Sequence, residues 1–111
     1  MDRPLKIAVC GASGRTGSRV AALAALDGRF HLAARVGRAQ AAALEDEIGA
    51  CGAVIDFSVP EATVKFAAAC GRAKVPLVIG TTGLTDVQRA QVAAAARKTA
   101  TPGHHGGASW N

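Results

Sequence analysis

The segment LKIAVCGASGRTG, residues 5–17, decides the fold of this chain. Leu5–Cys10 is a short apolar run rich in Ile and Val, which is typical of a strand buried on both faces of a parallel sheet. The glycine-rich loop Gly11–Gly17 follows directly, and a helical pattern extends from about Gly14 to Leu26. This order places free amides and the positive end of a helix dipole where they attract an anion. The segment therefore predicts a phosphate-binding loop, and the alternative is a glycine-rich turn without a ligand.

The alternation of strand and helix continues along the chain. Further strands are predicted at Phe30–Val36, Ala53–Phe57 and Pro76–Gly80, and further helices at Ala39–Ile48, from Ser58 onward and at Thr85–Lys98. Ser58 and Thr85 stand three residues before Glu61 and Gln88, which is the spacing of a capping box. These repeats predict an α/β fold with a doubly wound, Rossmann-like open parallel sheet of about four strands, forming a single domain over residues 1–98. Residues 99–111 show no periodicity and are expected to form a disordered tail.

Composition excludes several classes of function. The net charge is +5, but Lys and Arg are scattered along the chain and only 4% of residues are aromatic, so nucleic-acid binding is not expected. No signal peptide and no apolar stretch of about 18 residues is present, so we expect a cytoplasmic protein that does not enter a membrane. Cys10, Cys51 and Cys70 lack metal-ligand spacing and are expected to be reduced core residues, and no metal site is predicted.

The glycine loop has the spacing GxxGxxG, a variant of the dinucleotide-binding pattern. Gly11 is expected to permit the tight turn, Gly14 to let a pyrophosphate approach the backbone, and Gly17 to let the helix pack closely on the strand. Arg15 lies within the loop, where it either flanks the phosphates or remains an exposed, unpaired arginine.

The end of the second predicted strand bears on cofactor choice. The dinucleotide pattern usually places an acid there to bind the ribose hydroxyls, but this chain has Gly37 and Arg38. The guanidinium of Arg38 offers a fork that suits a 2′-phosphate. We therefore expect NADPH or NADH as cofactor, with NADPH favoured.

Two further segments, AVIDFSVPEAT (53–63) and PLVIGTTGL (76–84), place polar or glycine residues at the carboxyl ends of predicted strands. Open α/β sheets bind ligands at this edge. Phe57 is either an apolar wall for a flat ring or a core aromatic residue. Gly80, Thr81 and Thr82 either present amides and hydroxyls to a carboxamide or form a polar turn before the helix cap at Thr85.

Together with GASGRTG, these segments closely resemble the N-terminal domain of the dihydrodipicolinate reductase family, which has GxxGRMG, IDFSxPEAT and VIGTTG stretches in this order. The resemblance covers most of residues 7–98 and implies an NAD(P)H-dependent 4-hydroxy-tetrahydrodipicolinate reductase of lysine and diaminopimelate biosynthesis. It implies that Arg38 matches the arginine that binds the adenosine phosphate and that Gly37 replaces the ribose-binding acid. It places these residues at the pyrophosphate: Gly11, Ala12, Ser13, Gly14, Arg15 and Thr16. It places Gly80, Thr81 and Thr82 beside the nicotinamide.

The chain departs from the family pattern at its C-terminal end. The family continues into a second domain with an HHxxKxDAPSGT signature, which holds the proton donor and binds the dicarboxylate substrate. His104 and His105 lack the following lysine and are expected to be exposed tail residues. We therefore expect a truncated chain with no catalytic residues, which binds the dicarboxylate only if a second domain is supplied. Two alternatives remain open, a non-catalytic NAD(P)-binding module and a degenerate fragment, and so does the oligomeric state.

Overall fold

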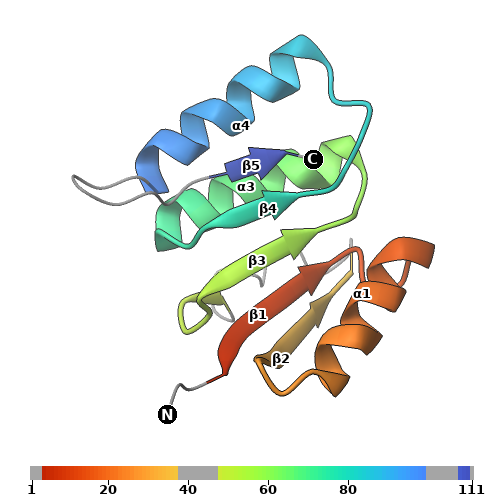
Figure 1. Ribbon diagram of the computed structural model, residues 1–111. Coiled ribbons are helices and arrows are strands. Elements are labelled where there is room, and N and C mark those ends of the chain that lie inside the picture. The colour runs from red at the N-terminus through yellow and green to blue at the C-terminus, as the bar shows by residue number, and fades with distance from the viewer. Residues whose placement is uncertain (1–3, 38–47, 100–107, 111) are drawn as a thin grey trace.

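The computed structural model describes residues 4–37, 48–99 and 108–110 and contains one parallel sheet, shown in Figure 1. Its five strands lie in the order β2-β1-β3-β4-β5. Their bounds are β1 Leu5–Cys10, β2 Phe30–Val36, β3 Ala53–Asp56, β4 Leu77–Ile79 and β5 Ala108–Trp110. The described helices are α1 Arg15–Leu26, α3 Pro60–Ala73 and α4 Asp86–Thr99. The predicted open parallel α/β sheet is therefore confirmed.

Helices cover both faces of the sheet, with α1 on one face and α3 and α4 on the other (Figure 1). Ile7 and Val9 of β1 pack in the cluster formed with α1, whereas Ala8 and Cys10 pack in the cluster that contains Phe66 of α3. The four β1 residues are 0–2% exposed. This alternation explains why β1 is apolar almost throughout, as expected for a parallel strand covered on both faces.

The strand order reverses direction beside β1. The chain passes from β1 to β2 on one side and then to β3 on the other, so β1 and β3 are neighbours at a topological switch point. The Phe57 amide donates to the Cys10 carbonyl oxygen at 3.0 Å, which holds the two outgoing loops together. In open α/β sheets the ligand crevice forms at such a point, outside the carboxyl ends of the strands.

The fifth strand corrects one expectation about the tail. Ala108–Trp110 pair in parallel with β4, so the predicted disorder is wrong for these three residues. The exposed edge of β4 supplies unpaired backbone groups, and pairing with them requires no periodic sequence. His104 and His105 lie outside the described residues, as do Arg38 and all of the predicted helix Ala39–Ile48 except Ile48, which is buried.

The two predicted capping boxes differ in outcome. At α4 the Gln88 amide donates to Thr85 Oγ1 at 3.1 Å and the Thr85 amide donates to Gln88 Oε1 at 2.8 Å, which confirms that box. At α3 the prediction is wrong, because the N-cap is Val59 and Pro60 opens the first turn. Among the described residues, no side chain caps this helix.

Along the described parts of the chain, no helix combines the length and the apolar character needed to cross a bilayer.

Candidate functional site at the carboxyl edge of the sheet

The glycine loop connects β1 to α1 through a left-handed turn. Gly11 has a φ of +76°, and its amide donates to the Val36 carbonyl oxygen at the end of β2 at 2.8 Å. The Gly14 amide then donates back to the Gly11 carbonyl oxygen at 3.0 Å. Gly14 is the N-cap of α1, and no side chain among the described residues caps the first amides of this helix. Free amides at a helix N-terminus bind anions, so the start of α1 presents donors suited to an anion.

Close backbone packing explains two of the glycines. A Cβ atom on Gly11 would lie 2.5 Å from the Phe57 carbonyl oxygen, and one on Gly17 would lie 2.0 Å from the Gly11 carbonyl oxygen. Neither position accepts a side chain unless the backbone moves. Gly14 differs, because its φ is −79° and an added Cβ would lie 3.4 Å from the Gly11 carbonyl oxygen. The loop therefore needs Gly11 and Gly17 to fold, whereas Gly14 is compatible with a larger residue.

Two hollows lie on either side of the loop. One, of about 290 Å³, extends toward β3 and is lined by Gly11, Ser13, Gly14, Phe57, Ser58 and Val59. The other, of about 230 Å³, extends toward β2 and is lined by Ala12, Ser13, Arg35 and Gly37. Ser13 lines both, so the two hollows meet at the loop. An elongated ligand with a central anion fits this arrangement, with its charge at the α1 amides and one end in each hollow.

Phe57 follows β3, and its ring lies beside the residue that follows β4. Its ring lies directly against Gly80, because a Cβ atom added there would be 2.2 Å from Phe57 Cε1. The Gly80 amide donates to the Asp56 carbonyl oxygen at 2.8 Å, which keeps the ends of these strands together. Phe57 and Gly80 are half-buried, so the ring is neither a core residue nor fully exposed. The structure thus brings Gly11, Phe57 and Gly80 together as adjacent parts of one edge.

Asp56 was missed by the sequence reasoning, although an acid at the end of the apolar run AVID is a visible signal. Its carboxylate is fully buried and accepts hydrogen bonds from the Ser58 amide at 2.9 Å, Thr63 Oγ1 at 2.5 Å and Thr81 Oγ1 at 3.2 Å. A buried charge is stable only when it is well hydrogen-bonded. Asp56 therefore ties the end of β3 to the first turn of α3 and to the loop after β4.

The remaining predicted site residues lie at the same edge but differ in exposure. Arg15 and Thr16 are exposed at the start of α1, and the Arg15 carbonyl oxygen accepts a hydrogen bond from Ser18 Oγ at 3.1 Å. Thr81 is buried with its hydroxyl directed to Asp56, whereas Thr82 is exposed. Arg38, the predicted 2′-phosphate ligand, lies outside the described residues.

Burial and the charge of Asp56 also act on the cysteines of the core. Burial, followed by the nearby Asp56 carboxylate, raises the pKa of the Cys70 thiol from 9.0 to about 12. The same two causes raise the pKa of Cys10 well above its ordinary value. Both thiols therefore stay protonated at neutral pH, as expected for inert core cysteines.

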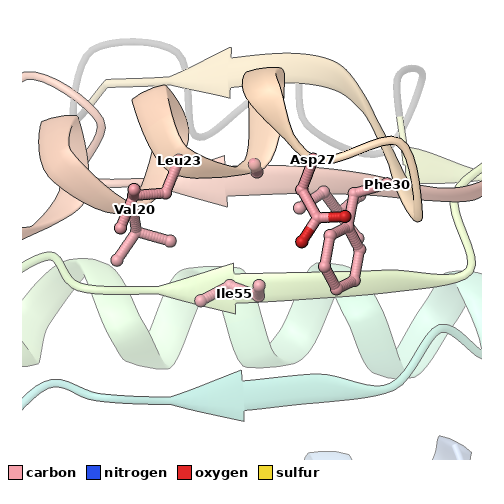
Figure 2. A pocket seen from close by; sticks show the side chains of 7 residues that line it. Val20, Leu23, Asp27, Phe30 and Ile55 are labelled. Atoms are coloured by element: carbon pink, nitrogen blue, oxygen red, sulfur yellow. The ribbon is translucent and has the colours of Figure 1, made fainter.

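A further hollow, of about 200 Å³, lies between α1 and β3 and is shown in Figure 2. Val20, Leu23, Phe30 and Ile55 line it, and Asp27 is the charged residue among the described residues that line it. The Asp27 carboxylate is paired with Arg29 at 2.7 Å, and its hydrogen bonds to Arg29 lower its pKa from 3.8 to about 2. Because Phe30 begins β2 and Asp27 follows α1, this hollow lies toward the amino edge of the sheet. It offers no donors for an anion comparable to the α1 amides.

Comparison with known proteins gives consistent matches. The profile of the family described as "Dihydrodipicolinate reductase, N-terminus" matches residues 5–102. The 4-hydroxy-tetrahydrodipicolinate reductase of Caulobacter vibrioides is 44% identical over 106 residues, which is 88% of this chain and 40% of that protein. The enzyme of the same name from Oleidesulfovibrio alaskensis is 38% identical over 86% of this chain and 42% of that protein. The chain thus spans about two fifths of the length of these relatives.

A solved structure is similar in fold. It is described as a dipicolinate-bound dihydrodipicolinate reductase from Paenisporosarcina sp. TG-14, and it superposes with a TM-score of 0.67 over 84% of this chain and 43% of that one. The sequence identity in this superposition is 18%, so the likeness concerns the fold alone.

Proposed function

The chain belongs to the dihydrodipicolinate reductase family, and we propose that it provides the nicotinamide-dinucleotide-binding part of an NAD(P)H-dependent 4-hydroxy-tetrahydrodipicolinate reductase. The observation that supports this most strongly is the uncapped N-terminus of α1, which lies between two hollows at the switch point of the sheet. A dinucleotide has the matching shape, because a central diphosphate joins two nucleoside ends.

The residues present fit such a cofactor. The uncapped amides at the start of α1 would hold the diphosphate, whereas the Gly11 and Gly14 amides already donate to the Val36 and Gly11 carbonyl oxygens. No Cβ atom of Gly11 or Gly17 restricts the loop. The hollow toward β3 accepts the nicotinamide end, with the Phe57 ring as its apolar wall and Gly80, Thr81 and Thr82 at the adjoining strand end. The hollow toward β2 accepts the adenosine end. When bound, the reduced nicotinamide supplies the hydride, and this chain holds and orients it.

The described residues beside the two hollows supply little else that the reduction needs. Reduction of a cyclic imine also needs a proton donor and groups that bind the substrate. Among the described residues that line the two hollows, only Arg35 is ionisable, and an arginine does not release its proton. We therefore propose that this chain binds the dinucleotide without turnover. Proton donation and dicarboxylate binding would depend on the part of the family that this chain does not match.

A single substitution separates binding from folding. Gly14→Asp places a carboxylate at the N-cap of α1, where the backbone already has a suitable conformation and an added Cβ meets only one atom, at 3.4 Å. The carboxylate would cap the amides that the diphosphate needs. Calorimetric titration should show NADPH binding to the wild type and a dissociation constant at least about tenfold higher for Gly14→Asp. The unfolding free energy should stay equal or rise by about 0.5 kcal/mol.

Gly28→Asp is the matched control, because it makes the same charge change at a position where an added Cβ meets no atom within 4 Å. It should bind NADPH like the wild type. A wild type that does not bind NADPH, or a Gly14→Asp variant that binds it as well as the control does, would overturn the proposal.

A further inference from the structure

An extra residue in β2 changes the face of the sheet to which the last side chains of that strand point. Ile7 of β1 pairs with Leu32, but the next residue, Ala8, pairs with Ala34, so Ala33 is an insertion in the ladder. Side chains alternate between the faces of a strand, and one extra residue reverses the alternation beyond it. Bulges of this kind often redirect a side chain beside a functional site.

The packing of β2 shows this reversal directly. Before the bulge, Phe30 and Leu32 pack on the face covered by α1. After it, Ala34 and Val36 pack on the face covered by α3 and α4. Arg35 lies between the latter two and therefore faces the side of α1. A regular strand would have placed all four apolar residues on one face and Arg35 on the other.

The reversal brings Arg35 to the glycine loop. Arg35 pairs in register with Val9, two residues before Gly11, and it lines the hollow formed with Ala12, Ser13 and Gly37. Its side chain is exposed, and no acidic residue in the described part of the chain lines this hollow or forms an ion pair with it. A guanidinium in this position is available for an anionic ligand.

We propose that Arg35 binds the 2′-phosphate on the adenosine ribose of NADPH and so determines cofactor preference. The inference rests on the proposed function, since it requires a dinucleotide across the glycine loop. The end of β2 is where dinucleotide-binding sheets read the adenosine ribose, and Gly37 leaves no carboxylate there to repel a phosphate. The planar fork of Arg35 suits a phosphate monoester. Under the proposed function the diphosphate, in contrast, would bind at the uncapped amides of α1.

Measuring both cofactors tests this assignment. The dissociation constants of NADPH and NADH are determined by titration for the wild type, for Arg35→Gln and for Arg89→Gln. Arg89→Gln is the control, because Arg89 is exposed on α4, on the opposite face of the sheet. For Arg35→Gln the NADPH constant should rise about tenfold, the loss expected for one charge-assisted hydrogen bond, while the NADH constant changes less than about twofold. The control should change neither.

Each other outcome overturns the inference. An equal rise for both cofactors would place Arg35 at the diphosphate, and no change for either would leave it without a role in binding. A wild type that binds neither cofactor would refute the proposed function itself, and with it this assignment. Binding of adenosine 2′,5′-bisphosphate against 5′-AMP gives a second readout, because Arg35→Gln should weaken only the bisphosphate.

Discussion

The Thr81 hydroxyl donates a hydrogen bond of 3.2 Å to the buried Asp56 carboxylate, which joins the loop after β4 to the end of β3. These two residues come from the two segments that flank the proposed nicotinamide hollow. Asp56 also accepts bonds from Thr63 and from the Ser58 amide, so one carboxylate organises both segments. The shape of this edge therefore depends on a residue that does not itself line either hollow.

Replacing Asp56 with alanine should lower the unfolding free energy by about 3 kcal/mol, because three buried or half-buried donors lose their acceptor. Thr81→Val removes one bond and should cost about 1 kcal/mol. Urea denaturation of both single variants and of the double variant measures the coupling between them. If Asp56→Ala and Thr81→Val were additive, the bond between these residues would not contribute to stability.

Gly17→Ala should destabilise the protein, although Ala normally stabilises a helix interior by about 1 kcal/mol relative to Gly. The reason is the distance of 2.0 Å between an added Cβ and the Gly11 carbonyl oxygen, which forces the loop away from α1. Gly14→Ala should be tolerated, because its added Cβ lies at 3.4 Å. Thermal unfolding of both variants measures the contrast, and a Gly17→Ala melting temperature at or above that of the wild type would refute the predicted packing.

Stability should decrease at alkaline pH in part through Cys70. Its pKa is raised in the folded state from 9.0 to about 12, so its contribution is complete below pH 9 and is lost as the pH rises toward 12. Urea unfolding at pH 8 and pH 10.5 should show a smaller loss for Cys70→Ala, which lacks the thiol, than for the wild type. An identical pH dependence in the two proteins would show that Cys70 does not contribute.

Thr85→Ala should lower the unfolding free energy by about 1 kcal/mol, since Thr85 and Gln88 cap α4 reciprocally. Ser58→Ala should cost less, because no side chain caps α3. Chemical denaturation of the two variants compares these positions. A larger loss for Ser58→Ala would contradict the observed start of α3.

Ser58 and Thr85 show which features of the fold the sequence alone predicts. Local signals predicted β1 to β4, the described helices and the Thr85 cap, because hydrophobic periodicity and capping depend on neighbours in the chain. Ser58 has the same spacing relative to Glu61, but its amide donates a hydrogen bond to the Asp56 carboxylate, and the helix begins at Pro60. That outcome depends on the buried network with Thr63 and Thr81, which spacing alone does not reveal.

Arg35 and β5 show the same limit. The letters FHLAARV alternate as a regular strand would, and only the register with β1 shows the inserted residue that turns Arg35 toward the glycine loop. Ala108–Trp110 join the sheet because the edge of β4 lies beside them, not because of a strong strand pattern. Expectations for Arg38, His104 and His105 stay predictions, since these residues lie outside the described part of the chain.

The most direct measurement is an amide NMR titration of the isotopically labelled chain with NADPH. Binding at the uncapped N-terminus of α1 should shift the amide resonances of Ser13–Gly17 most strongly, with smaller shifts at Arg35 and Phe57 and none across α4. Large shifts confined to other parts of the sheet, or no shifts at saturating NADPH, would contradict binding of the diphosphate by the glycine loop.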